Sequence, residues 1–299
     1  MHFEYEHLAE GRKREIIDFD RGRRGDVVRI AMGTGRGCVL YGKTAPVTLL
    51  VPLKGRLQVC AGDSTHTIAP GQLLVVEGDQ SVQLLGRGPA MWVALLASTP
   101  AWRGLTAVDS TLHVREPVLL PGLHTADHLI RRGIIAMVRA ATLARQDSLA
   151  TQAAAASVAA AIDYLQTEFD QLIERCPGRT HAQRRAVFLR LHRVRNLMVS
   201  SCHLELDLAE CARRASYSPC HFIRAFSAVY GETPHAVLVE QRLRRAHRLL
   251  NSSVLAITEV ARISGFEDRC AFARSFKRRF GMTATDLRDQ RHASLQAVA

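Results

Sequence analysis

Two stretches of this chain resemble each other: residues 208–233 read LAECARRASYSPCHFIRAFSAVYGET, and residues 257–283 read ITEVARISGFEDRCAFARSFKRRFGMT. Their first halves align at an offset of 49 residues, and their second halves at an offset of 50. A repeat of this size indicates that one small supersecondary unit is built twice. We therefore predict a first module at about residues 206–231 and a second module at about residues 256–281.

Each module has the pattern of a helix, a tight turn and a second helix. The first helix carries a small residue, Ala212 or Ala261, where the second helix must cross closely. The turn of the second module contains Gly265, which adopts a positive φ readily, whereas the first module has Ser216 at that position. The pattern predicts two helix-turn-helix modules.

The second helix of each module has recognisable ends and a buried stripe. Ser218 and Asp268 are N-cap candidates, and Gly231 and Gly281 stand where each helix should end. Between these ends, aromatic residues recur at helical spacing: Phe222, Phe226 and Tyr230, and then Phe272, Phe276 and Phe280. This spacing predicts a core-facing stripe rather than a surface that stacks on bases.

The net charge of +12 is concentrated in the C-terminal part of the chain. Residues 1–178 have 19 Lys and Arg against 18 Asp and Glu, a net of +1, and residues 179–299 have 21 against 10, a net of +11. We therefore predict a charge-neutral domain, 1–178, followed by a domain, 179–299, that binds a polyanion such as nucleic acid. An even distribution would have favoured simple solubility.

Residues opposite the aromatic stripes are the candidates for contact with double-stranded DNA. The candidates for reading bases are Cys220, Ile223, Arg224, Arg269, Cys270 and Arg274. Arg274 and Arg269 are the strongest, with Arg224 behind them, because arginine donates two hydrogen bonds to guanine and discriminates by about 1–3 kcal/mol. The candidates for phosphate contact are Ser218, Lys277, Arg278 and Arg279. The alternative for each is a solvated side chain.

The segment 234–250 joins the modules and has one apolar side along a helical pattern, with Pro234 suited to its first turn. A continuous helix is a stiff spacer, so it would hold the modules at a fixed distance. Two readers must meet successive major grooves about 34 Å apart on one face of the DNA. The linker therefore favours a single chain that reads two half-sites.

With these motifs, about residues 206–288 resemble the DNA-binding domain of the AraC/XylS family of bacterial transcription regulators. The matching motifs include Leu208-Ala209, Ser218-Pro219, Phe222, Arg224, Phe226, Gly231, Arg242-Leu243, Ala246, Gly265-Phe266, Phe272, Arg274, Phe276 and Gly281. The chain departs from the family pattern at Ser216, where glycine is usual, and at Cys220 and Ile223, where polar residues are typical. We therefore expect the second module to supply most of the base discrimination.

The resemblance implies a sequence-specific transcription regulator with RNA polymerase as a partner. It also implies that residues 1–178 sense an effector or dimerise. We expect an activator that a small molecule or a protein partner controls through this domain, and that forms a homodimer. The alternative is an N-terminal half that only dimerises, without a small-molecule effector.

The N-terminal domain is predicted to begin with short strands at about residues 26–100. They lie at residues 27–30, 47–51, 56–59, 66–68, 73–76 and 82–85, each bounded by turn residues. Helices follow at about 117–175, as His124–Ala144 and Ser148–Ile173, and a basic hinge at Arg179–Arg185. The predicted fold is α+β: a small, cupin-like β-barrel or sandwich with trailing helices, then an all-α domain.

One face of the second long helix is apolar at helical spacing, and its residues are Ile162, Leu165, Phe169, Leu172 and Ile173. Packing against the strands and dimerisation through a helix pair explain this face equally well.

Several other classes of protein are disfavoured. The seven cysteines form no Cys-x-x-Cys pair, which favours a reducing cytoplasm over a disulfide scaffold or zinc module. Residues 1–20 lack the apolar core of a signal peptide, and no stretch has the roughly 18 apolar residues of a membrane helix. His66 is the only histidine between residues 8 and 112, so a metalloenzyme is not expected. We predict no cofactor, no metal and no enzymatic activity.

Overall fold

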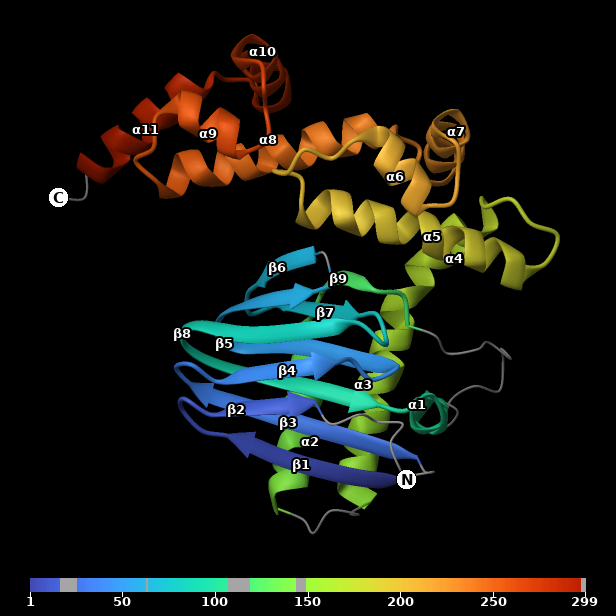
Figure 1. Ribbon diagram of the computed structural model, residues 1–299. Helices are drawn as coiled ribbons and strands as arrows, with labels where there is room; N and C mark the ends of the chain where they lie inside the picture. The colour runs from blue at the N-terminus through green and yellow to red at the C-terminus, as the bar shows by residue number, and fades with distance from the viewer. Residues whose placement is uncertain (17–25, 63, 107–118, 144–148, 297–299) are drawn as a thin grey trace. The chain divides into compact units, whose positions relative to one another are not determined.

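The computed structural model describes residues 1–16, 26–62, 64–106, 119–143 and 149–296, with side chains up to residue 291. The chain divides into two compact units, Met1–Gln171 and Leu172–Ala299, which are described separately (Figure 1). The domain boundary predicted after residue 178 stays a prediction.

The first unit is built on one sheet, whose strands follow the order β1-β3-β8-β5-β7-β9. In addition, β4 pairs with β8, β2 pairs with β4, and β6 pairs with β5. The strands are β1 His2–Leu8, β2 Lys13–Ile16, β3 Val27–Gly35, β4 Val39–Lys43, β5 Val47–Ala61, β6 Ser64–Ile68, β7 Gln72–Val76, β8 Ser81–Ala97 and β9 Gly122–Thr125. β1 pairs with β3, and β2 with β4, in parallel, and the other pairs are antiparallel.

The sheet has apolar packing on both faces. On one face, Leu49 and Val93 pack against the helices, and on the other Leu50 and Trp92 belong to a second apolar core. Residues 47–51 are therefore buried without alternation, as expected for a strand covered on both sides. The predicted α+β fold is confirmed: an N-terminal β-rich sheet domain with trailing helices precedes an all-α unit.

Helices cover one face of this sheet (Figure 1). They are α1 Thr99–Thr106, α2 His128–Leu143 and α3 Leu149–Gln166, followed by the 3₁₀ turn η2 Thr167–Phe169 and by α4 Asp170–Glu174. Ile162 packs in the core between helices and sheet, and Leu165 packs against that core.

The structure corrects several predicted boundaries of the first unit. The helix predicted from His124 is wrong at its start: His124 lies in β9, and α2 begins at His128 because Asp127 Oδ1 accepts from the Ile130 amide at 2.9 Å. The strands predicted at 47–51 and 56–59 are one strand, β5, with register shifts between Pro52 and Arg56. Residues 117, 118, 144 and 148, at the predicted helix ends, lie outside the described residues.

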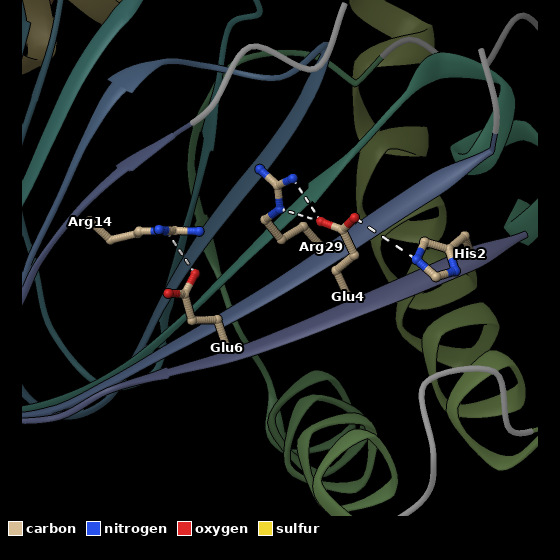
Figure 2. A network of polar contacts seen from close by, with 5 residues as sticks. All are labelled: His2, Glu4, Glu6, Arg14 and Arg29. Atoms are coloured by element: carbon tan, nitrogen blue, oxygen red, sulfur yellow. Dashed lines mark hydrogen bonds and ion pairs between the residues drawn. The ribbon is translucent and has the colours of Figure 1, made fainter. Parts of the chain in front are cut away.

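The strand β1 carries charged side chains on its surface (Figure 2). Glu4 accepts two hydrogen bonds from Arg29, at 2.9 and 2.7 Å, and His2 Nε2 lies 3.9 Å from Glu4 Oε1. Glu6 pairs with Arg14 at 2.9 Å. Such partly exposed pairs contribute about 0–1 kcal/mol each to folding, so their main effect is to keep the edge of the sheet polar.

The second unit is all helical. After α4, it contains α5 His181–Ser200, α6 Leu208–Arg214, α7 Pro219–Tyr230, α8 Pro234–Ser252, α9 Ile257–Ile263, α10 Arg269–Phe280 and α11 Ala284–Gln296. The basic hinge predicted at Arg179–Arg185 is wrong, because Thr180 and Gln183 form a capping box that starts α5 at His181. Within the described residues, no helix is both long and apolar enough to cross a membrane.

Candidate nucleic-acid interface

The first module consists of α6, a turn and α7. Asp207 caps α6, since its Oδ1 accepts from the Ala209 amide at 3.1 Å. The chain then turns at Ser216, which has a φ of 60° although it is not a glycine. Ser218 stands at the N-cap position of α7, as predicted, but its hydroxyl lies 3.1 Å from His221 Nδ1 and makes no capping hydrogen bond.

The second module, α9 to α10, has the same architecture with a more relaxed turn. Gly265 supplies the positive φ, 94°, which costs a glycine little. Asp268 caps α10 as predicted, because its Oδ1 accepts from the Cys270 amide at 2.8 Å. Both second helices end at a left-handed glycine, Gly231 with φ 75° and Gly281 with φ 74°.

The aromatic stripes are core, as predicted, except that Tyr230 and Phe280 at their ends are only half-buried. Phe222 and Phe226 are fully buried in the first module, and Phe272 and Phe276 in the second, at 0–1 % exposure. Consecutive rings lie edge to face or tilted, with centroids 4.6–5.5 Å apart. This packing turns the opposite face of α7 and of α10 toward solvent.

The residues predicted to read bases lie on those opposite faces. Ile223 is half-buried, and the other five are exposed: Cys220, Arg224, Arg269, Cys270 and Arg274. No described residue bonds to the guanidinium groups of Arg224, Arg269 and Arg274, so each is available to an external acceptor. Base reading by these residues stays a prediction.

The residues predicted to bind phosphate differ in their surroundings. Ser218, Lys277 and Arg278 are exposed. Arg279 is also exposed but donates two hydrogen bonds to Glu240 of α8, at 2.7 and 2.9 Å, and these bonds lower the pKa of Glu240. Arg279 therefore ties α10 to the linker helix and keeps only its remaining guanidinium N–H groups for a phosphate.

Sequence reasoning missed that the repeat begins one helix earlier. Residues 190–196 of α5 read RLHRVRN, and residues 245–251 of α8 read RAHRLLN, identical at four positions. In α5, His192 stacks on Phe188 at 5.1 Å and lies 3.4 Å from the Tyr230 hydroxyl. Its counterpart His247 packs on Phe280, with ring centroids 4.7 Å apart. Each repeat therefore has three helices, and the shared RxHRxxN pattern was the signal available in the sequence.

These histidines hold the C-terminal end of each module's second helix, the recognition helix α7 or α10, against the first helix of its repeat, α5 or α8. Arg195 lies over the Tyr230 ring at 5.1 Å, and burial raises the pKa of the Tyr230 hydroxyl. Arg175, just after α4, donates to the Val229 carbonyl at 3.3 Å. The first recognition helix is thus anchored to α5 and to the residue following α4, and the second to α8.

No metal centre is part of this interface in the described ranges, 1–16, 26–62, 64–106, 119–143 and 149–296, because no group of three or more His, Cys, Asp or Glu side chains is placed to hold an ion.

Comparison with known proteins assigns the second unit. The model of a helix-turn-helix domain family matches residues 211–290. The chain is 27% identical over 248 residues to the HTH-type transcriptional regulator ExsA of Pseudomonas aeruginosa, covering 78% of this chain and 82% of that protein. It is 35% identical over 81 residues to the virulence regulon transcriptional activator VirF of Yersinia enterocolitica, of whose length the match spans 30%.

Among solved structures, the DNA-binding domain of AdpA in complex with a target DNA aligns with 30% identity and a TM-score of 0.34, covering 35% of this chain and 95% of that one. The family match falls on α6 to α11, where the repeated modules lie. The second unit therefore contains a helix-turn-helix domain similar to those of AraC-type bacterial transcription regulators, as the sequence resemblance predicted.

Proposed function

We propose that this protein is a transcription activator that reads two half-sites on one face of double-stranded DNA and takes most of its specificity from the second module. The observation that carries this proposal is the difference between the two exposed faces. On α10, Arg269 and Arg274 are exposed and bond to no described residue, whereas α7 offers Arg224 beside the exposed Cys220 and the half-buried Ile223.

The positions of the basic residues along α10 support base contacts from its first half and phosphate contacts from its last turn. Arg269 and Arg274 lie in its first half, where side chains reach base edges when the N-terminal end of a recognition helix enters the major groove. Lys277 and Arg278 lie in its last turn and would meet the phosphate backbone. Cys270 and, on α7, Cys220 would contribute small contacts to bases, and Ser218 and Arg279 contacts to phosphate.

Control is proposed to come through residues 1–178. The second apolar core of this domain is tightly packed around Trp92, which is fully buried, and a Cβ on Gly33 would lie 2.2 Å from its ring. This packing favours a protein partner on the outside over a small molecule inside. Leu129 of α2 and Tyr164 of α3, at 58% and 77% exposure, support a second copy of the chain as one such partner.

Activation is supported by the relatives, since VirF is named as a transcriptional activator. An activator acts on RNA polymerase at promoters, so the proposal places the protein in the bacterial cytoplasm. The alternative, a regulator whose N-terminal half only dimerises, predicts the same DNA binding without any response to a partner.

In vitro selection from random duplexes with the full-length protein tests the proposal. We expect an enriched motif of two half-sites, centred about 10–10.5 base pairs apart, with more information in one half. Binding should also weaken steeply as salt rises, because phosphate contacts release counterions. Transcription by purified RNA polymerase should increase on a promoter bearing the motif. A motif with a single half-site, or repression at every position, would contradict the proposal.

A further inference from the structure

The loop between α5 and α6, residues 201–207, reaches from the first repeat to the turn of the second module. It has seven residues, whereas the corresponding connection between α8 and α9, residues 253–256, has four. The loop starts buried, with Ser201 and Cys202 at 3% and 4% exposure, and its last residue, Asp207, caps α6. Whatever holds this loop therefore also positions the first helix of the first module.

Arg242 of α8 holds the loop through its backbone. The guanidinium donates from Nε to the Cys202 carbonyl at 2.8 Å and from Nη2 to the Leu204 carbonyl at 3.2 Å. Arg242 is half-buried, and this burial lowers the pKa of its guanidinium while leaving it charged. Hydrogen bonds from a charged donor in a partly desolvated place are stronger than neutral ones at the surface.

The turn of the second module packs against the same contact between Arg242 and the loop. A Cβ on Gly265 would lie 2.7 Å from Arg242 Nε and 2.8 Å from the Cys202 carbonyl oxygen. A glycine is thus needed at 265 for space as well as for its φ of 94°. The counterpart in the first module, Ser216, is exposed and carries a side chain at a φ of 60°.

Beside this contact, the loop and the second module are separated by a hollow of about 490 Å³. It is lined by His203, Leu204 and Glu205 of the loop and, on the second module, by Arg262, Phe266 and Arg269. Where the hollow separates the loop from the module, the two hydrogen bonds from Arg242 and the close approach of Gly265 to the Cys202 carbonyl connect the loop to the second repeat.

We propose that Arg242, seated against Gly265, is a positioning residue that fixes the relative orientation of the two modules and thereby the spacing of half-sites that the protein accepts. This inference rests on the proposed reading of DNA by both modules. Arg242 on the linker helix fixes the loop, the loop ends in the cap of α6, and α6 carries α7. Without this clamp, the linker helix still connects the modules, but the first module turns more freely about it.

The experiment uses full-length protein and a duplex of about 30 base pairs that carries the selected two-part site. Three further duplexes serve for comparison: one with about five base pairs inserted between the half-sites, half a helical turn, one with a whole turn inserted, and one with the first half-site scrambled. Dissociation constants are measured by fluorescence anisotropy at fixed salt for the wild type, Arg242→Met and Arg248→Ala. Arg248 is exposed on the same helix, so its replacement removes an equal charge and leaves the loop bonded.

For the wild type, inserting half a turn should weaken binding by about 100-fold, the low end of what linking two modules contributes. For Arg242→Met, we expect this penalty to shrink to about tenfold while binding to the original spacing also weakens by about tenfold, because preorganisation is lost. On the duplex with the scrambled first half-site, Arg242→Met should bind within about twofold of the wild type, because only the second module contacts a specific site there. Arg248→Ala should keep the full spacing penalty.

Gly265→Ala should release the loop by a second route, because its Cβ would push the loop away from Arg242. If this variant folds, it should reduce the affinity penalty of the half-turn insertion in the same way. Arg242→Met needs no new atom at the contact and tests the clamp if Gly265→Ala does not fold. A wild type that is indifferent to both insertions would overturn the two-module reading together with the clamp. An Arg242→Met protein that keeps the wild-type spacing penalty would overturn the clamp alone.

Discussion

The two helix-turn-helix modules share one scaffold and differ in what that scaffold presents. In both, two phenylalanines of the second helix are fully buried, and a left-handed glycine ends that helix. The turns differ, with Ser216 at φ 60° in the first and Gly265 at φ 94° in the second. The exposed faces differ more, because α10 presents Arg269 and Arg274, which bond to no described residue, whereas α7 presents only Arg224 in that state. The repeat therefore preserves packing, and its chemistry has diverged.

The modules also differ in how their recognition helices are tied down. The C-terminal end of α7 contacts α5 through Tyr230 and His192, at 3.4 Å. The corresponding end of α10 is tied to α8 by the ion pair of Arg279 with Glu240. A part-buried hydroxyl–imidazole contact in the first repeat is thus replaced by an exposed ion pair in the second, and the two should respond differently to salt.

The largest effect should come from removing a buried phenylalanine from either module. Phe226→Ala and Phe276→Ala should each lower the free energy of unfolding of the C-terminal unit by about 3–5 kcal/mol, because each deletes a fully buried ring. Urea denaturation followed by circular dichroism measures the loss. Comparable values would support a shared scaffold, whereas a loss below about 1 kcal/mol in one module would contradict the conclusion that both modules have the same packed core.

The repeated scaffold was the part of the fold most accessible from sequence, because its signals are local. The glycines, caps and aromatic spacing of each module lie within about 25 residues, where helical periodicity and turn chemistry act. The strands β1 and β2 were missed because they pair in parallel with β3 and β4, and no local pattern marks such a pairing. His124 was placed in a helix because nothing near it indicates that Gly122–Thr125 pairs with β7.

The candidate site was predictable to a similar extent and for the same reason. The exposed positions of Arg269 and Arg274 follow from the phase of the helix, which the aromatic stripe fixes. The partner of Arg279 was not predictable, since Glu240 lies 39 residues away on another helix. The contact of Arg242 with two loop carbonyls was equally hidden, because a backbone acceptor leaves no trace in the sequence.

The next effect sharpens the difference between the exposed faces. Arg274→Ala should weaken binding to the selected site by about 1–3 kcal/mol and relax the preference at one base pair, because a bidentate contact to guanine is lost. Arg224→Ala should weaken it less and leave the preference in the second half-site unchanged. Anisotropy titrations against the selected site and its single-base variants measure both. If the two losses were equal, or Arg274→Ala kept the wild-type preference, the second module would not be the main reader.

A smaller effect concerns the turns. Ser216→Gly should raise the free energy of unfolding by about 0.5–1 kcal/mol, because glycine relieves the cost of a side chain at a φ of 60°. Gly265→Ser should destabilise the C-terminal unit by more than that, since its Cβ would also meet Arg242 and the Cys202 carbonyl. Paired urea titrations measure the two changes, and equal and opposite values would mean that the turns differ only in backbone strain.

The smallest effect should distinguish the ties of the two recognition helices. The hydrogen bonds from Arg279, more than those from Arg244, hold the pKa of Glu240 below its ordinary value. A lowered folded-state pKa means that this tie stabilises the protein fully above the ordinary pKa of about 4.3 and loses that contribution as pH falls through the folded-state value. Glu240→Gln should therefore lower Tm at pH 7 by about 1 °C or less, as expected for an exposed pair, and have still less effect near pH 3. Thermal melts at both pH values, repeated in high salt, measure this.

Tyr230→Phe, which removes the hydroxyl from His192 in the first repeat, is the matched control, and its effect should not depend on salt. If the two variants lost stability with the same salt dependence, the ion pair of the second repeat would be equivalent to the Tyr230–His192 contact of the first.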